Sequence, residues 1–300
     1  MPTGPANTTG MVDDAFIFIV VCCVVLLAVV TTCMVVFLIK YNRKRHPHPE
    51  HVEENMILEI VWTAVPTILV CFMFYIGWTD FKYIRNPPQD AITVHVTARQ
   101  WSWLFEYENG KGSDVLNVPR GKPVKLIMTS VDVLHCLFIP AYRIKEDCVP
   151  GMKTHLWFTA NEVGDYDIFC TEYCGLGHSH MRSKVVVMTP DDFTTWHGKA
   201  AVLTAAGQGL KILQAKGCLG CHSLDGSRKV GPTFKDLAGR DETVIIAGQE
   251  KHITVDETFI HDHIINPQSA TAKGYPPIMP QIPLTDEELK TIVNYLGTVK

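Results

Sequence analysis

The sequence predicts a multidomain protein that has a helical hairpin in a membrane, then an all-β domain, and then an all-α domain. Three observations support this fold class: two long apolar stretches, a period-two pattern of apolar residues after them, and helix-start signals near the C-terminus. The 300 residues are 47% hydrophobic and 19% charged, with a mean hydropathy of +0.10. This composition fits a short membrane anchor joined to soluble domains. The net charge of −4 gives no basic surface, so no nucleic-acid partner is expected.

Two apolar stretches, at about residues 15–39 and 57–78, predict a transmembrane hairpin over residues 15–80. The first carries no charge, and the second is interrupted only by Glu59 and Pro66. At 1.5 Å of rise per residue, either helix can cross a hydrocarbon layer of about 30 Å. A signal peptide is the alternative for the first stretch, but the positive segment expected before it is missing. We therefore expect a retained helix.

The charges beside these helices predict their orientation. Lys40, Arg43, Lys44 and Arg45 lie between them, whereas the tail at residues 1–14 has no Lys or Arg. The positive-inside rule puts the loop in the cytoplasm and both termini outside. The prediction is a multi-pass protein of the bacterial cytoplasmic (inner) membrane, in contact with lipid, whose later domains lie on the periplasmic side.

Residues 90–190 have the alternating pattern of β-strands. Ile92, Val94 and Val96 alternate with polar residues, and turn signals separate the runs that follow. These later runs are residues 124–128, 155–158, 166–170 and 184–188. Short strands with regular turns predict a β-sandwich or barrel.

Sulfur and nitrogen donors gather in this β domain. Residues 170–181 read C-T-E-Y-C-G-L-G-H-S-H-M, and His135 lies upstream. One thiolate with two imidazoles and a weak methionine would hold a single electron-transfer copper, but two thiolates allow two copper ions to be bridged. A structural zinc ion is the alternative, which Met181 and the β context disfavour. The sequence leaves open whether Cys136 and Cys148 form a disulfide.

His135 and this motif resemble the dinuclear copper (CuA) loop of cytochrome c oxidase subunit II, and the hairpin resembles the same family. The resemblance implies a cupredoxin-like Greek-key β-barrel in which Cys170 and Cys174 bridge two copper ions. The other implied copper ligands are His135, His178, Met181 and the backbone carbonyl of Glu172. The Glu172 carboxylate is implied to reach a magnesium ion at the contact with subunit I.

Two further residues gain a role from the resemblance. Trp101, in Gln-Trp-Ser-Trp, matches the position where electrons enter the copper centre, although an aromatic residue on a strand usually packs in a core. Glu59 matches a glutamate at the cytoplasmic entrance of a proton channel. A carboxylate that the positive end of its helix favours is the alternative for Glu59.

The composition changes again after the β domain, which predicts a linker at residues 191–206 and a second outer domain at residues 207–300. The marker of this domain is the C-x-x-C-H motif of Cys218, Cys221 and His222. In such a motif, two thiols bond covalently to haem and the adjacent histidine coordinates the iron.

Helix signals follow the C-x-x-C-H motif. Thr254 with Glu257, and Thr285 with Glu288, are expected to form capping boxes that open two helices. The apolar residues of the last helix recur with helical spacing. These features resemble class I cytochrome c, which implies an all-α domain.

Met279, in the proline-rich loop of residues 274–280, is the expected sixth ligand of the haem iron. A methionine ligand raises the reduction potential. The resemblance also implies that the Pro232 carbonyl accepts a hydrogen bond from His222. The alternative iron ligands are His252, His261 and His263.

The whole pattern predicts subunit II of a haem-copper terminal oxidase, with copper, one covalent haem c and, at the subunit I contact, magnesium. Electrons would pass from an external donor, such as a cytochrome or a respiratory complex, to haem c, then to copper and to subunit I. Oxygen reduction and proton pumping would occur in subunit I, with further subunits present. The alternatives are the corresponding subunit of a nitric oxide or nitrous oxide reductase, or a membrane-anchored electron carrier or copper-delivery protein.

Overall fold

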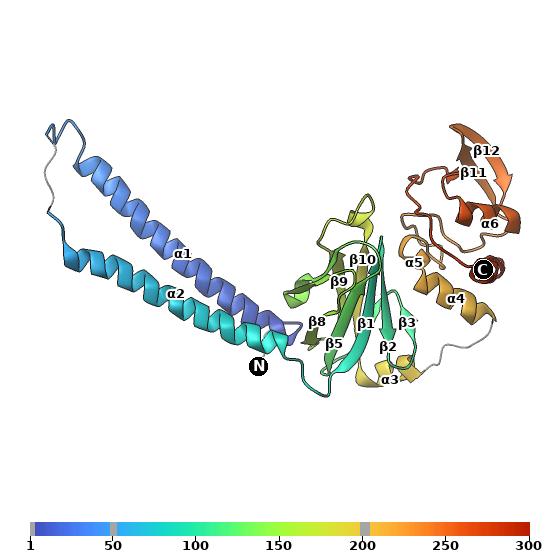
Figure 1. Cartoon of the computed structure of the whole chain (residues 1–300), viewed down its shortest axis with the longest axis horizontal. Coiled ribbons are helices and arrows are strands. Elements are labelled where there is room, and N and C mark those ends of the chain that lie inside the picture. The colour runs from blue at the N-terminus through green and yellow to red at the C-terminus, as the bar shows by residue number, and fades with distance from the viewer. Residues whose placement is uncertain (1–3, 49–52, 199–204) are drawn as a thin grey trace. The chain divides into compact units, whose positions relative to one another are not determined.

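The computed structural model describes residues 4–48, 53–198 and 205–300, and the chain divides into two compact units, Met1–Asn86 and Pro87–Lys300. The first unit is a hairpin of α1 (Asn7–Lys40) and α2 (Met56–Arg85), shown in blue and cyan in Figure 1. Phe18 and Phe72 pack edge to face across the two helices, with ring centroids 5.7 Å apart. The side chain of Asn55 begins α2 by accepting a hydrogen bond from the Leu58 N–H.

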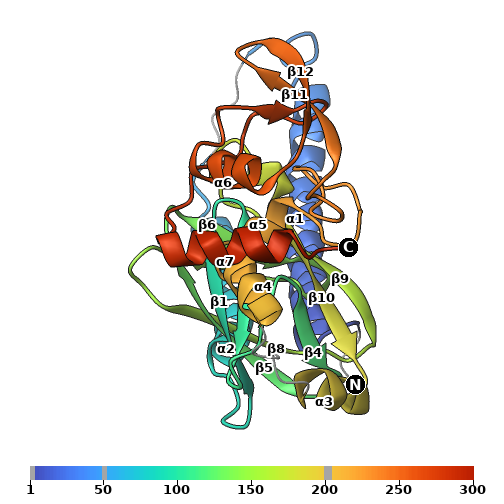
Figure 2. The ribbon, with the colours of Figure 1, turned by 90° about the vertical axis from the view of Figure 1, so that its right-hand side faces the viewer.

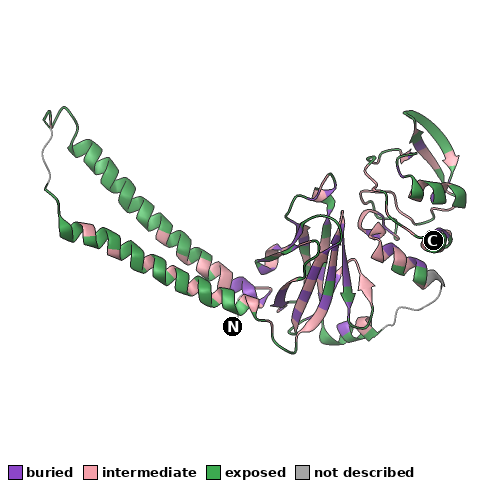
Figure 3. Ribbon diagram, viewed as in Figure 1, coloured by how far each residue is buried: buried purple, intermediate pink, exposed green. Residues whose placement is uncertain are grey.

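Both helices are longer than the apolar stretches that predicted them. The 34 residues of α1 span about 50 Å, and the helix begins at Asn7, inside the stretch expected to be an N-terminal tail. Their apolar side chains are exposed along the spans, as the green colour in Figure 3 shows. Since such surface is unfavourable in water, the chain is a membrane protein that places these helices in lipid.

The second unit begins with a sandwich of two five-stranded sheets, as the predicted fold class requires. One sheet has the order β3-β2-β1-β5-β8, and the other has the order β4-β10-β9-β6-β7. The strands of the first sheet are β1 (Ile92–Arg99), β2 (Ser102–Tyr107), β3 (Gly112–Ser113), β5 (Pro123–Ser130) and β8 (Thr154–Thr159). The strands of the second are β4 (Leu116–Pro119), β6 (His135–Ile139), β7 (Ile144–Cys148), β9 (Gly164–Cys170) and β10 (Arg182–Met188).

The alternating pattern in the sequence positions the core of this sandwich. Val124, Leu126 and Met128 alternate with less buried residues along β5 and are fully buried. Each of the five predicted strand runs lies in an observed strand. The pairs β1–β5 and β4–β10 are parallel, and the other strand pairs are antiparallel, so the two sheets are mixed.

The stretch expected to be a linker begins with a helix, α3 (Pro190–Gly198). Trp196 of α3 packs edge to face on Tyr107 of the sandwich, with ring centroids 5.0 Å apart. This segment is thus partly packed against the β domain. Residues 199–204 of the predicted linker lie outside the described residues.

The C-terminal region contains α4 (Ala205–Ala215), α5 (Cys218–Cys221), α6 (Glu257–Ile265) and α7 (Asp286–Leu296). Helices α4 and α7 cross one another (Figure 2). The apolar stripe predicted for α7 forms much of their core, through Leu289, Ile292, Val293 and Leu296. The capping box of Thr285 and Glu288 is confirmed, because each side chain accepts from the other residue's backbone N–H.

This region also contains a sheet that the sequence reading did not anticipate. Its strands are β11 (Asp241–Ile246), β12 (Gln249–Thr254) and β13 (Thr271–Ala272). The capping box predicted at Thr254 is wrong, because Thr254 ends β12 and its hydroxyl donates to Asp241. The side chain of Asp256 caps α6 instead, accepting from the Phe259 N–H at 2.7 Å.

Candidate metal centres

The fold brings together the donors predicted to bind copper. His135 is the first residue of β6 and Cys170 is the last residue of β9, which is the neighbouring strand. Cys174, His178 and Met181 lie on the loop that leads to β10. The register of two adjacent strands therefore joins donors that are thirty-five positions apart in the sequence.

The donor atoms lie within reach of a shared metal site. The two sulfur atoms of Cys170 and Cys174 are 3.8 Å apart, too far for a disulfide bond. His135 Nδ1 lies 3.9 Å from the Cys170 sulfur, and His178 Nδ1 lies 3.4 Å from the Cys174 sulfur. The Met181 sulfur is 3.9 Å from Cys174, and the Glu172 carbonyl is 3.2 Å from Cys170.

Burial and hydrogen bonding set the two thiols apart. Burial raises the pKa of Cys174 to about 12, and the neighbouring Cys170 adds to this effect. Burial acts the same way on Cys170, but hydrogen bonds with His135 and nearby backbone lower its pKa to about 7. Two thiols, two imidazoles, a thioether and a carbonyl exceed the four ligands of a structural zinc site, and soft sulfur donors fit copper.

An acidic side chain that the sequence analysis did not predict contacts one of the histidine ligands. Asp132 Oδ1 lies 2.8 Å from His135 Nε2, the ring nitrogen that faces away from the cysteines. A carboxylate in this position fixes the tautomer and the orientation of a metal-binding histidine. An acidic residue three positions before a ligand histidine is the only signal that the sequence offers for it.

Trp101 packs against the copper loop. Its indole N–H donates to the Cys174 carbonyl at 3.0 Å, and its ring fills the space where Gly177 would carry a Cβ atom. Trp103 has the place of an ordinary core aromatic, because it is only 3% exposed and packs edge to face on His135. Trp101 itself lies in the turn between β1 and β2 and is only partly buried, and its role in electron entry stays a prediction.

The structure also answers the question of the remaining outer cysteines. Cys148 lies opposite His135 in the β6–β7 register, and Cys136 lies opposite Asp147. Since successive side chains on a strand point to opposite faces, Cys136 and Cys148 face away from each other. Both are buried free thiols.

Two predicted residues have surroundings that do not yet define a role. The Glu172 side chain is exposed, although its carbonyl belongs to the ligand set. Glu59 lies in the first turn of α2, where the helix dipole favours a carboxylate. The proposed metal and proton roles of these two carboxylates stay predictions.

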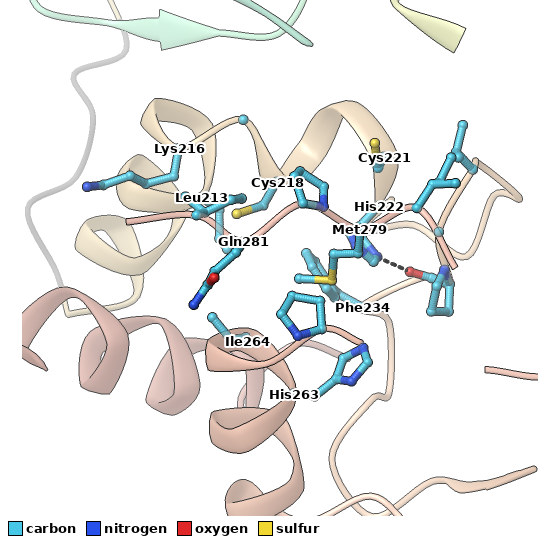
Figure 4. Close-up of a pocket in the computed structure, with 18 of the residues that line it drawn as sticks. Leu213, Lys216, Cys218, Cys221, His222, Phe234, His263, Ile264, Met279 and Gln281 are labelled. Carbon is cyan, nitrogen blue, oxygen red and sulfur yellow. Dashed lines mark hydrogen bonds between the residues drawn. The ribbon is translucent and has the colours of Figure 1, made fainter. Parts of the chain in front are cut away.

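The haem motif lines a cavity of about 660 Å³, which lies within the range of about 300–1,000 Å³ for cofactor pockets. Cys218, Cys221, His222 and Met279 all face it from α5 and from the loop before α7 (Figure 4). The lining is largely apolar, which suits a porphyrin. The four predicted haem residues are thus brought together.

The His222 imidazole is neutral and oriented, as a metal ligand must be. Burial lowers its pKa to about 4, so the imidazole is neutral near pH 7. Its Nδ1–H donates to the Pro232 carbonyl at 2.7 Å, as expected, and this leaves Nε2 free as a ligand. Phe234, which the sequence reading missed, stacks on the imidazole with ring centroids 4.4 Å apart.

The loop that carries Met279 is fixed by glutamine side chains. Gln268 donates to the Met279 carbonyl at 3.2 Å, and Gln281 donates to the Ile265 carbonyl at 3.1 Å. Among the alternative histidines in the described chain, only His263 lines the cavity (Figure 4). His252 pairs with Thr243 on the exposed hairpin, and His261 pairs with its neighbour Asp262.

The same cavity is lined by residues of the copper domain, within the unit Pro87–Lys300. These are Arg99, Gln100, Trp101, Val131 and Asp132. The two donor sets therefore share Trp101 and Asp132 as neighbours. A membrane-anchored chain with copper and haem donors so arranged is an electron-transfer protein.

Comparisons with known proteins give the family. The family model "Cytochrome C oxidase subunit II, transmembrane domain" matches residues 5–82, and "Cytochrome C oxidase subunit II, periplasmic domain" matches residues 111–189. "Cytochrome c" matches residues 206–300. The chain belongs to the cytochrome c oxidase subunit II family and carries a C-terminal cytochrome c domain.

Similar proteins cover most of the chain. "Cytochrome c oxidase subunit 2" of Alkalihalophilus pseudofirmus is 30% identical, over 88% of this chain and 80% of the relative. "Alternative cytochrome c oxidase subunit 2" of Bradyrhizobium diazoefficiens is 30% identical, over 64% of this chain and 80% of the relative. The crystal structure of the periplasmic domain of subunit II (CoxB) of Bradyrhizobium japonicum is 28% identical, with a TM-score of 0.37 over 38% of this chain and 96% of that one.

Proposed function

We propose that this chain is the electron-accepting subunit of a haem-copper terminal oxidase in the aerobic respiratory chain. It passes electrons from an external donor, through a covalent haem c and a dinuclear copper centre, to subunit I. Oxygen is reduced to water in subunit I, with proton pumping, so the chain is part of an enzyme without holding its catalytic site. The observation that carries this proposal is that Trp101 contacts the copper loop and also lines the haem cavity.

One set of residues would bind copper and another would bind haem. Both cofactors supply reversible one-electron chemistry when bound. Cys170 and Cys174 would hold the copper pair together with His135, His178, Met181 and the Glu172 carbonyl. Cys218 and Cys221 would attach haem c, and His222 and Met279 would coordinate its iron. Pro232 orients His222 by accepting its Nδ1–H. Trp101 is where electrons enter the copper centre.

Each role belongs to one of the segments that the sequence predicts. Residues 15–80 anchor the chain, residues 90–190 hold copper, and residues 207–300 hold haem, with residues 191–206 joining the last two. Magnesium at Glu172, proton uptake at Glu59, and contacts with lipid and further subunits belong to the same proposal. Glu172 is exposed, which suits a residue that reaches a partner subunit.

The proposed topology puts both cofactor domains outside the cytoplasm of a bacterial inner membrane. In intact spheroplasts, a membrane-impermeant amine reagent is expected to modify Lys184, which is exposed on β10, and to spare Lys44 in the predicted cytoplasmic loop. Opening the membrane should make Lys44 reactive. Labelling of Lys44 before Lys184 would contradict the proposed topology. It would also contradict the haem assignment, because haem c is attached outside the cytoplasm.

The function is tested with the purified membrane complex. We expect the signals of haem c, subunit I haem and a mixed-valence copper pair together, and rapid turnover of oxygen with a reduced donor. The same sample should turn over nitric oxide or nitrous oxide much more slowly. Faster reduction of a nitrogen oxide would favour the reductase alternative, and purification without a haem-bearing large subunit would favour an independent electron carrier.

A further inference from the structure

Gln100 lies in the turn between β1 and β2 and contacts two separate parts of the copper ligand set. Its backbone N–H donates to Asp132 Oδ2 at 2.7 Å. Its side-chain amide donates to the Cys174 carbonyl, also at 2.7 Å. Among the described residues, no other residue donates hydrogen bonds to both Asp132 and Cys174.

The first contact leads to a histidine ligand. While Asp132 Oδ2 accepts from Gln100, Asp132 Oδ1 lies 2.8 Å from His135 Nε2. The Val133 N–H also donates to this carboxylate, at 2.6 Å. Because hydrogen bonds hold both of its oxygens, the Asp132 carboxylate has little freedom to rotate. The His135 imidazole that it orients is restricted in the same way.

The second contact leads to a cysteine ligand. The Cys174 carbonyl accepts from the Gln100 amide and from the Trp101 indole, which uses both of its lone pairs. The next residue, Gly175, has a positive φ of 109°, and a Cβ atom there would lie 3.0 Å from the Gln100 amide nitrogen. The loop therefore follows the surface that Gln100 and Trp101 present.

We propose that Gln100 is a positioning residue of the copper centre. It links Asp132, which orients His135, to the peptide that carries Cys174, and so fixes the distance between the two halves of the ligand set. Asp132 precedes β6, whereas Cys174 lies on the loop between β9 and β10. The proposal rests on the proposed function, since it takes the copper pair as the occupant.

The expected effect follows from the tolerance of metal sites. Ligands must be held within about 0.5 Å of the productive geometry, and loss of an outer-shell partner costs about 10–100-fold in metal affinity or activity. Gln100 retains its backbone N–H after any side-chain change except proline. A side-chain substitution therefore removes only the contact with Cys174.

The test uses the full chain with its haem attached. Gln100→Ala and the isosteric Gln100→Glu, which lacks the amide donor, are expected to weaken copper binding about tenfold in competition with a chelator. The copper hyperfine pattern in the EPR spectrum should also change. Asn109→Ala is the matched control, because Asn109 likewise donates to a backbone carbonyl, that of His197, away from the ligands.

Two further measurements distinguish positioning from a general effect. In the copper-free protein, amide hydrogen exchange at residues 174–178 should speed up in both Gln100 variants and not in Asn109→Ala. Combining Gln100→Ala with Asp132→Asn should cost clearly less than the product of the single effects, because both act through one linked unit. Parent-like copper affinity, EPR spectrum and loop exchange in Gln100→Glu would overturn the proposal. A parent chain without a copper pair would refute the proposed function instead, and the exchange result would still decide the role of Gln100.

Discussion

Replacing Cys174 by serine is expected to abolish the dinuclear copper signal and leave haem c attached. Cys174 lies within 4 Å of three other predicted donors, Cys170, His178 and Met181, so its loss removes the centre of the ligand set. A hydroxyl is a harder and weaker ligand for copper than a thiolate. Oxygen turnover should fall by more than the roughly 100-fold upper limit for outer-shell changes.

The copper-to-haem ratio and the EPR spectrum of the purified complex measure this outcome. Haem attachment serves as the internal check on folding, because the haem residues share no ligand with the copper set. Cys136→Ser is the matched control, since Cys136 is equally buried in β6 but lies outside the ligand set. A parent-like mixed-valence signal in Cys174→Ser would contradict the assignment of Cys174 as a bridging ligand.

The copper ligands could be predicted from the sequence because most of them lie on one short loop. The spacing of residues 170–181 already limits which donors can meet, and only His135 had to come from a distant segment. Asp132 and Gln100 could not be predicted in the same way. Their contacts depend on the turn after β1 and the loop after β5 meeting at one end of the sandwich, which no local pattern encodes.

In the C-terminal domain, local sequence signals predict the helices but not the β-sheet. Its helices begin and end near their local signals, and the stripe on α7 is buried as expected. The β11–β12 hairpin was missed because its strands lack a regular alternation of buried and exposed residues, and much of β12 is exposed. Its turn is nonetheless visible at Ala247 and Gly248, which both have positive φ values, of 51° and 81°.

Replacing Met279 by alanine is expected to leave haem bonded to Cys218 and Cys221 while lowering its reduction potential. The Met279 side chain lines the same cavity as His222, and a methionine ligand favours the reduced iron. Axial ligands change haem potentials over about 0.8 V, so a fall on the order of 0.1 V or more is expected. Redox titration of the complex, with the sulfur-to-iron absorption band as a second readout, measures it.

His263 is the alternative iron ligand that affects the interpretation of the Met279→Ala variant. It lines the cavity, and its Nδ1 is buried with no hydrogen-bond partner among the described residues. Burial lowers its pKa, so the ring is neutral near pH 7 and could bind the iron once Met279 is gone. His263→Ala alone should retain the sulfur-to-iron band if Met279 is the ligand. Absence of that band in the parent protein, together with an unchanged potential in Met279→Ala, would make His263 the sixth ligand instead.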